Sequence, residues 1–192
     1  MAPRTLRSRR STAAAGSDPE LISTIPLRSS TSWSAPTRDV VRPGLSVILC
    51  DVNVLVYAFR VESPRHAEFR DWLRERAAAA EPFGVADLVL SGVLRVLTHP
   101  RVFEPATPLN HALAFAAALR AQPNSVILRP GPRHWDIFTQ LCTAGRAKGN
   151  LVADAFLAAL AIEHGCEWIT TDRDFARFPG LRWRHPLDVA IG

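Results

Sequence analysis

The sequence predicts an α/β protein that folds as three layers, α/β/α, around a central, mainly parallel sheet of four to five strands. Short apolar runs alternate with helical segments through most of the chain, which is the pattern of consecutive βαβ units. The runs are apolar at consecutive positions, so each strand is expected to be buried on both faces. Parallel sheets that are covered by helices on both faces have strands of this kind.

Each expected strand is a short apolar run. The runs are 47–50, 83–86, 125–128 and 167–170, with a candidate fifth strand at 181–184. Asp51 directly follows the first strand, and Asp172 closely follows the fourth. In open sheets of this class, ligands bind beyond the carboxyl ends of the strands, near the point where the strand order reverses. Both acids are therefore placed where a ligand site is expected.

Helix-start and helix-stop residues set the expected helices between these strands. Ser63 (followed by Pro64), Asp87 and Asn150 are predicted N-caps, and Gly165 is predicted to follow a helix C-terminus. The expected helices are 52–59, 64–80, 88–98, 108–121, 132–144 and 151–164.

The positive charge of the chain is concentrated near its N-terminal end. The 192 residues include 23 Lys and Arg against 18 Asp and Glu, a net charge of +5. Residues 1–45 hold seven Arg and three acids, which leaves a net charge of +1 for residues 46–192. A nucleic-acid role therefore cannot be inferred from the overall charge, and any phosphate-binding surface has to be local.

Residues 1–45 are expected to form a disordered basic leader, and residues 46–192 a single folded domain. The leader has no apolar periodicity, so we expect it to lie outside the core and to be dispensable for stability. Its acid-poor composition loosely resembles a transit peptide, and it lacks the apolar core of a secretory signal. An alternative start codon could fall at Leu45 or Val47, so the leader is also a candidate artefact of start-site choice.

Composition and cysteine usage favour a globular protein of the cytoplasm. Hydrophobic residues make up 47% of the chain, which is ordinary for a globular domain. The longest apolar stretch, 151–162, contains Asp154 and is shorter than the roughly 18–20 residues of a membrane span. Cys50, Cys142 and Cys166 have no metal-site spacing and cannot all pair, so reduced thiols are expected.

Carboxylates are the residues that most clearly indicate chemistry. Asp154 lies within an apolar helix, where a charge is costly unless a cation or donors lie nearby. Asp172 and Asp174 follow the fourth strand, and Asp51 follows the first. Each acid could simply cap or start a helix. Together, such acids would repel one another unless a cation holds them, and hard oxygen ligands suit Mg²⁺ or Mn²⁺.

Other chemistries have little support. The sequence has no GxxxxGK[ST] phosphate loop, no GxGxxG after the first strand and no GxSxG elbow. The six His residues show no i, i+4 pairing, so no zinc site is expected. A phosphohydrolase with Asp51 as nucleophile would need a second Asp at the position of Asn53.

Four segments together resemble the PIN-domain family, and within it the VapC-like toxin ribonucleases. They are 48–55 (ILCDVNVL), 92–103 (GVLRVLTHPRVF), 149–161 (GNLVADAFLAALA) and 170–175 (TTDRDF). The resemblance covers about residues 46–188 and leaves out the leader. It implies a PIN-like fold and an Mg²⁺- or Mn²⁺-dependent endoribonuclease, the toxin of a toxin–antitoxin pair. It also implies a homodimer and a small VapB-like antitoxin protein encoded beside it.

The resemblance also implies roles for individual residues. Asp51 and Asp154 match the metal-ligand acids of the family, and Asp172 matches the acid of its T-x-D segment. Thr170 matches the Thr of that segment. Asn53 matches the polar residue that supports the first acid.

We expect hydrolysis of RNA by a metal-bound water, with no covalent enzyme intermediate. Asp51 and Asp154 would hold the metal, while Asp172 and Asp174 would orient the attacking water or a second metal. The expected substrate-binding residues are Asn53, Thr170, Arg146, Lys148 and Arg173, and for the three basic residues the alternative is solvated surface.

One position departs from the family pattern. Gly92 stands where the family commonly has a Glu, so a non-catalytic PIN-like module that binds RNA or a partner is the alternative function. Asp87 is expected to cap its helix, and a second possibility is that it reaches the site as a distant ligand through water.

Overall fold

The computed structural model describes residues 16–18, 20–21 and 47–188 of the chain. Five strands form one sheet in which all neighbours are parallel, in the order β3-β2-β1-β4-β5. The strands are β1 (Ile48–Cys50), β2 (Phe83–Ala86), β3 (Ser125–Leu128), β4 (Glu167–Ile169) and β5 (Trp183–Arg184). The predicted parallel α/β sheet is confirmed, including its candidate fifth strand.

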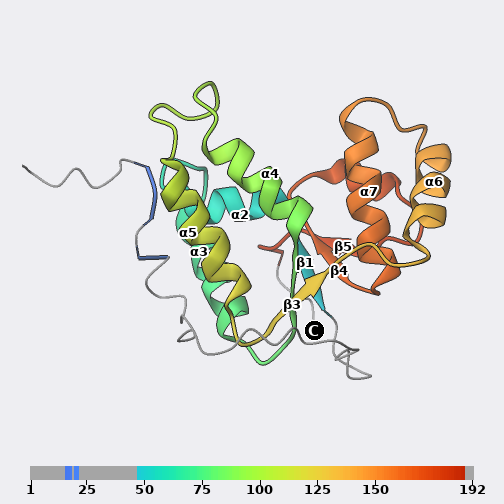
Figure 1. Ribbon diagram of the computed structural model, residues 1–192, viewed down its shortest axis with the longest axis horizontal. Helices are drawn as coiled ribbons and strands as arrows, with labels where there is room; N and C mark the ends of the chain where they lie inside the picture. The colour runs from blue at the N-terminus through green and yellow to red at the C-terminus, as the bar shows by residue number, and fades with distance from the viewer. Residues whose placement is uncertain (1–15, 19, 22–46, 189–192) are drawn as a thin grey trace, which may run out of the picture.

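Within residues 47–188, six α-helices and a short 3-10 helix surround this sheet. They are α2 (Val52–Phe59), α3 (His66–Ala78), α4 (Asp87–Leu97), α5 (Leu109–Arg120), α6 (His134–Ala144), α7 (Asn150–Glu163) and η1 (Arg173–Arg177). Helices α2 to α5 gather on one side of the strands, and α6 and α7 lie together on the other (Figure 1). Within the described ranges, no helix has the length and apolarity to cross a membrane.

The strand order reverses between β1 and β4. From β1 the chain moves outward through β2 to β3, and it returns to add β4 and β5 on the other side of β1. The carboxyl ends of β1 and β4 therefore lie side by side, with Leu49 opposite Trp168 and Cys50 opposite Ile169. This arrangement places Asp51 and Thr170 at the switch point, where sheets of this class bind ligands.

Three helix starts differ from the sequence prediction. Helix α3 begins at His66, after Arg65 in a left-handed conformation, so Ser63 is not its N-cap. The N-cap of α4 is Ala86, so Asp87 does not cap this helix with its side chain. Asp87 lies in the first turn instead, where its negative charge interacts favourably with the helix dipole. The N-cap of α7 is Gly149, whose φ of 56° and ψ of −126° suit a residue without a Cβ. Gly165 does follow the end of α7 with a positive φ, as predicted.

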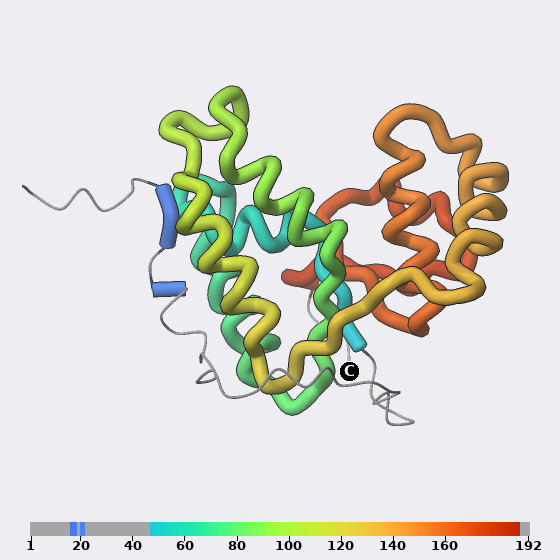
Figure 2. The backbone as a smooth tube through the Cα atoms, viewed as in Figure 1, coloured from blue at the N-terminus to red at the C-terminus, as the bar shows by residue number. Residues whose placement is uncertain are grey.

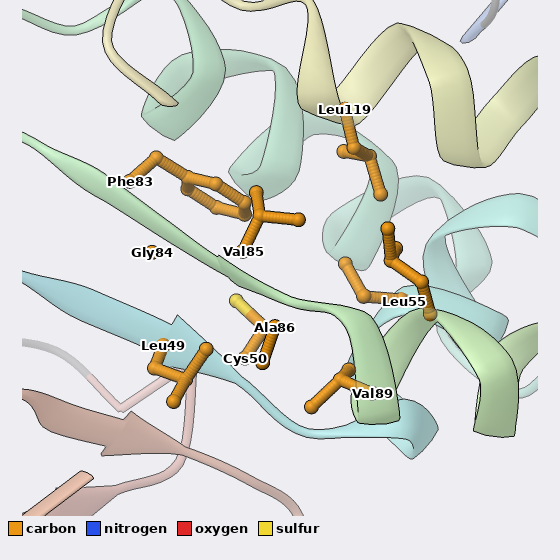
Figure 3. Close-up of a pocket in the computed structure, with 10 residues that line it drawn as sticks. Leu49, Cys50, Leu55, Phe83, Gly84, Val85, Ala86, Val89 and Leu119 are labelled. Carbon is orange, nitrogen blue, oxygen red and sulfur yellow. The ribbon is translucent and has the colours of Figure 1, made fainter. Parts of the chain in front are cut away.

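The core lies between the sheet and its helices and is closely packed. Figure 3 shows a gap where β1 and β2 meet α2, α4 and α5, lined by apolar side chains and Cys50. Its volume of about 10 Å³ is at the lower limit for one water molecule. Cys50 and Cys166 are buried, and none of the three cysteines forms a disulfide. The gap is a packing defect of the core and does not open a ligand site.

Part of the expected leader packs on the folded domain. Ser17 forms an antiparallel bridge with Arg60, and the amide of Asp18 donates to the carbonyl of Phe59 at 3.1 Å. The Asp18 carboxylate lies 3.3 Å from Nε2 of His66, on the first turn of α3. Leu21 is fully buried within the main hydrophobic core. Figure 2 shows this blue segment against the helices of the α2–α5 group.

These contacts correct the expectation of a leader outside the core for the residues concerned. Five leader residues, 16–18 and 20–21, are described, and they are held by backbone pairing, by an ion pair between Asp18 and Arg70 and by burial of one leucine. We call them the N-terminal strap. The rest of the expected leader lies outside the described residues, and so does the expected domain boundary at 45/46.

Candidate active site

Asp51 is held firmly at the carboxyl end of β1. It is the N-cap of α2, and its Oδ1 accepts a 2.6 Å hydrogen bond from the amide of Val52. Its Oδ2 accepts from the side-chain amide of Asn53 at 2.8 Å and from the hydroxyl of Thr170 at 2.6 Å. Burial raises the pKa of Asp51 above its usual range, and the Thr170, Val52 and Asn53 hydrogen bonds oppose that rise. Asp51 therefore caps α2, one of its predicted roles, and is at the same time a buried acid at the end of β1.

Asn53 and Thr170 lie in the same hydrogen-bond network. Asn53 also donates to the Thr170 hydroxyl oxygen at 3.2 Å and accepts from the Thr171 amide at 3.3 Å. Thr170 is fully buried, and its hydroxyl oxygen also accepts from the amide of Asp172 at 3.0 Å. The hydrogen bonds of this fully buried side chain fit a residue that positions Asp51, and the substrate contact predicted for Thr170 stays a prediction.

Asp154 lies on α7 and faces the same region. Its side chain is half-buried, and within the described part of the chain it accepts no hydrogen bond and forms no ion pair. Burial raises its pKa to about 6, and the charges of Asp51, Asp172 and Asp174 contribute to the rise. The Asp154 carboxylate is therefore an uncompensated negative charge beside three other acids.

Asp172 and Asp174 follow β4 and complete the acidic group. Asp172 is the N-cap of η1, because its Oδ1 accepts from the amide of Asp174 at 2.8 Å. Asp174 is 63% exposed, and its Oδ1 is paired with Nη2 of Arg177 at 2.7 Å. Asp172 therefore caps a short helix, which was the simpler of its two predicted roles. Its charge also raises the pKa values of Asp51 and Asp154.

An open cavity of about 580 Å³ is lined by three of the four acids, Asp154, Asp172 and Asp174, while the more deeply buried Asp51 is not among its lining residues. Its lining residues are Arg146, Lys148, Asn150, Leu151, Asp154, Asp172, Asp174 and Arg177. Two of the three expected phosphate-binding residues, Arg146 and Lys148, are thus brought to the acids. Arg173 is exposed on η1 but does not line this cavity. Sequence reasoning missed Arg177, because its place in the cavity depends on how η1 packs, which no local motif indicates.

The donor set of this site suits a hard divalent cation. Its ligands would be carboxylate oxygens, and a bound cation would relieve the mutual repulsion of Asp51 and Asp154. No three His, Cys, Asp or Glu side chains of the described residues are grouped closely enough to enclose a metal by themselves. Mg²⁺ is commonly bound by one or two carboxylates and keeps several waters, so two acids are a sufficient anchor.

Gly92 is next to the site and has no room for a larger side chain. A Cβ at this position would lie 2.7 Å from Cγ2 of Val52, the residue that follows Asp51. The branched Val52 side chain therefore occupies the space that a side chain at position 92 would need.

Asp87 does not replace the missing Glu. Its carboxylate pairs with Arg120 on α5 and lies 3.8 Å from Nε of Arg129. It is not among the residues that line the cavity. Its carboxylate already has two cationic partners, so the structure gives no support to the distant-ligand possibility.

Comparison with known proteins agrees with this geometry. The PIN domain family matches residues 48–181. A VapC ribonuclease of Mycobacterium bovis, Mb2897, is 50% identical over 142 residues, which are 73% of this chain and 97% of that protein. Ribonuclease VapC25 of Mycobacterium tuberculosis is 43% identical over 140 residues, 73% of this chain and 99% of that protein.

Solved structures share the fold at low sequence identity. VapBC2 from Rickettsia felis, bound to a promoter DNA fragment, matches with a TM-score of 0.54 and 16% identity over 72% of this chain and 98% of that one. VapBC-1 from nontypeable Haemophilus influenzae matches with a TM-score of 0.52 and 13% identity over 74% and 99%. With the family match and the 50% identical relative, the fold and the acids at its switch point lead to one conclusion: the chain belongs to the PIN-domain family, in its VapC branch.

Proposed function

We propose that this chain is the toxin of a toxin–antitoxin pair and a divalent-metal-dependent endoribonuclease that hydrolyses RNA phosphodiester bonds. The observation that supports this most directly is Asp154, a half-buried carboxylate with no partner among the described residues and a pKa raised to about 6. A structural acid would be paired with a donor or a cation. An acid kept charged at neutral pH without a partner suits the binding of a cation.

The metal, Mg²⁺ or Mn²⁺, would be held by Asp51 and Asp154. When bound, it supplies the positive charge that stabilises the phosphate in the transition state and lowers the pKa of a coordinated water. Thr170 and Asn53 hold the Asp51 carboxylate in one orientation. Asp172 uses Oδ1 for the Asp174 amide, so Oδ2 is left to orient a water molecule.

The substrate class follows from the charges around the cavity. Arg146 and Lys148 lie on the loop before α7 and line the cavity beside the acids. Cations at this place bring a polyanion to an otherwise repulsive acidic site, and they contact phosphates without reading sequence. RNA is the substrate named for the curated VapC relatives, and the same substrate is proposed here.

A VapB-like antitoxin and a second copy of the chain are the proposed partners, in the cytoplasm. The two solved neighbours named above carry the name VapBC, and the curated relatives named above carry the name VapC. Helix α5 has two large exposed apolar side chains on one face, Leu109 at 58% and Leu113 at 47%. A partner that packs on this face of α5 would bury both side chains. Helix α3 has no large apolar side chain in the exposed class over its length.

The test is cleavage of a labelled RNA by the purified protein with Mg²⁺ or Mn²⁺, compared with excess EDTA and with Asp154→Asn. We expect cleavage with the metal and none with EDTA or the variant. Cleavage that persists in EDTA would contradict the metal mechanism. Retention of RNA without cleavage under every metal condition would favour the non-catalytic module that Gly92 suggests. Co-expression with the small protein encoded next to it should relieve growth inhibition, and unchanged toxicity would exclude that partner.

A further inference from the structure

Arg177 is placed at the cavity by its own helix. Its Nη2 donates to Oδ1 of Asp174 at 2.7 Å, and its Nε donates to the main-chain carbonyl of Asp174 at 3.1 Å. These two bonds fix the guanidinium plane while they use only two of its five N–H donors. The side chain is 42% exposed and lines the cavity together with Asp154 and Asp172. The remaining donors are thus available to a ligand in the cavity.

Arg177 lines the cavity together with Asp154 but does not neutralise it. Its ion pair is with Asp174, and it forms none with Asp154. Because Asp174 holds the guanidinium, Asp154 stays available for a cation. An arginine paired directly with Asp154 would compete with the metal, and this arrangement avoids the competition.

Arg177 lines the cavity with two other cations, which come from a different segment of the chain. Arg146 and Lys148 come from the loop before α7, and Arg177 comes from η1. The two segments touch, since a Cβ on Gly145 would lie 3.3 Å from the ring of Phe178, the residue after Arg177. All three cations line the same cavity, so together they offer it positive charge from two segments, which suits the negative charge of a nucleic-acid backbone.

We propose that Arg177 binds a phosphate of the RNA strand, and that Asp174 is a positioning residue that holds Arg177 for this contact. The inference rests on the proposed endoribonuclease function. It gives Asp174 a role other than the orientation of water or of a second metal expected from the sequence. A planar guanidinium suits this task because it donates to two phosphate oxygens at once, with one edge already fixed by Asp174.

The first test is RNA binding measured in the Asp154→Asn background, so that cleavage does not consume the probe. A fluorescent single-stranded RNA is titrated and its anisotropy recorded with and without Arg177→Gln. We expect Kd to rise by about 10-fold, the loss of one charge-assisted contact. The slope of log Kd against log salt should fall by about 0.7, since one fewer phosphate is neutralised. Arg177→Lys should give an intermediate Kd, because it keeps the charge and loses the planar fork.

The matched control is Arg65→Gln. Arg65 also forms an exposed i, i+3 pair, with Glu68 at 2.7 Å, but at the start of α3 and away from the cavity. The Arg65→Gln substitution removes the same charge from the same kind of ion pair. It should therefore leave Kd and the salt slope within about twofold of the values for Asp154→Asn alone. Equal Kd values for Arg177→Gln and Arg65→Gln would overturn the phosphate contact.

The second test separates the two roles of Asp174 through a double-mutant cycle on steady-state cleavage. If Asp174 only positions Arg177, Asp174→Asn and Arg177→Gln both raise KM more than they lower kcat, and the double variant is no worse than Arg177→Gln. If the effects of the two substitutions on kcat/KM multiply in the double variant, or if Asp174→Asn lowers kcat at unchanged KM, Asp174 acts on the chemistry. Either result would overturn the positioning role. A wild-type protein that fails to cleave RNA with any metal contradicts the proposed function, while the binding comparison still decides on Arg177.

Discussion

The hydroxyl of Thr170 donates a 2.6 Å hydrogen bond to Oδ2 of Asp51, and this bond joins the end of β4 to the end of β1. Thr170→Val removes it with little change of volume. We expect the pKa of Asp51 to rise further, because this bond opposes the effect of burial. Metal affinity and cleavage should fall by about 10- to 100-fold, the usual effect of losing a group that orients a metal ligand. Isothermal titration with Mn²⁺ and RNA cleavage measure the two effects.

The neighbouring Thr171→Val is the control for that variant. Thr171 bonds to Asn53 through its main-chain amide, which the substitution keeps. Metal affinity should stay within about twofold of wild type. An equal loss in both variants would mean that general disturbance of this loop, and not the Thr170 hydroxyl, explains the result.

Asp51→Asn and Asp154→Asn should both abolish cleavage but should change stability in opposite directions. Asp51 accepts three hydrogen bonds, so Asn at that position places an amide against donors and lowers the free energy of unfolding by about 1–3 kcal/mol. Asp154 accepts none among the described residues, and its pKa is raised to about 6. A carboxyl with a raised folded-state pKa destabilises the fold at pH above that value, so Asn should stabilise the metal-free protein.

The expected gain for Asp154→Asn at neutral pH is about 1 kcal/mol, after allowance for solvent screening. It is fully present above pH about 6 and disappears as the pH falls toward about 4, because the wild-type carboxyl then becomes protonated in both states. Urea unfolding in EDTA at several pH values measures it. A destabilised Asp154→Asn protein at neutral pH would contradict the picture of an uncompensated charge.

Metal-dependent cleavage should decline as the pH falls through about 6. Protons and the metal compete for Asp154, whose pKa is raised to about 6, so fewer molecules bind the metal below that pH. A higher metal concentration should shift the midpoint of the decline to lower pH. A midpoint that is independent of metal concentration would indicate that a different group controls the profile.

Gly92→Glu should not restore a fourth acid by itself. The new side chain would meet Val52, 2.7 Å from the first added carbon, and overpacking of this kind costs about 1–3 kcal/mol. Val52→Ala makes room, so the double variant should recover stability relative to Gly92→Glu. Thermal unfolding of the single and double variants tests this. Additive losses of stability would show that Val52 is not the obstacle.

The N-terminal strap should contribute to stability. Leu21→Ala removes a fully buried side chain, which lowers the free energy of unfolding by about 2–5 kcal/mol. Leu88→Ala is the control, because Leu88 is 49% exposed and should lose less than about 1 kcal/mol. A chain that starts at Leu45 should be destabilised as well. If the free energy of unfolding is unchanged in Leu21→Ala and in the shortened chain, the strap does not stabilise the domain and is dispensable.

The sequence was sufficient for the sheet, the helices and the position of the acids. Consecutive apolar residues identify a buried strand locally, and an acid directly after such a strand lies at its carboxyl end. Helix starts were less predictable, because Arg65 and Gly149 act through backbone conformation and not through a capping side chain. Ser63, Asp87 and Asn150 looked like caps because their chemistry is suitable, but the chain turns at neighbouring residues.

Two features depended on tertiary packing that local pattern does not contain. Leu21 lies in a short run that also holds Ile22, Ile25 and Leu27, but Pro19 and Pro26 interrupt it, and it is too short for a periodicity from which burial could be inferred. Arg177 reaches the cavity only because η1 packs against the loop before α7. Such contacts join positions far apart in the chain, and without the fold they cannot be told from ordinary surface residues.

The bond between Thr170 and Asp51 also has a consequence for the order of events during protein synthesis. The two residues are separated by 119 positions, and β4, which brings Thr170 into place, is the fourth of the five strands to be made. A growing chain on the ribosome carries Asp51 early but cannot orient it until β4 has emerged and paired with β1. The hydrogen bond that orients Asp51 therefore forms late in synthesis, after most of the chain has been made.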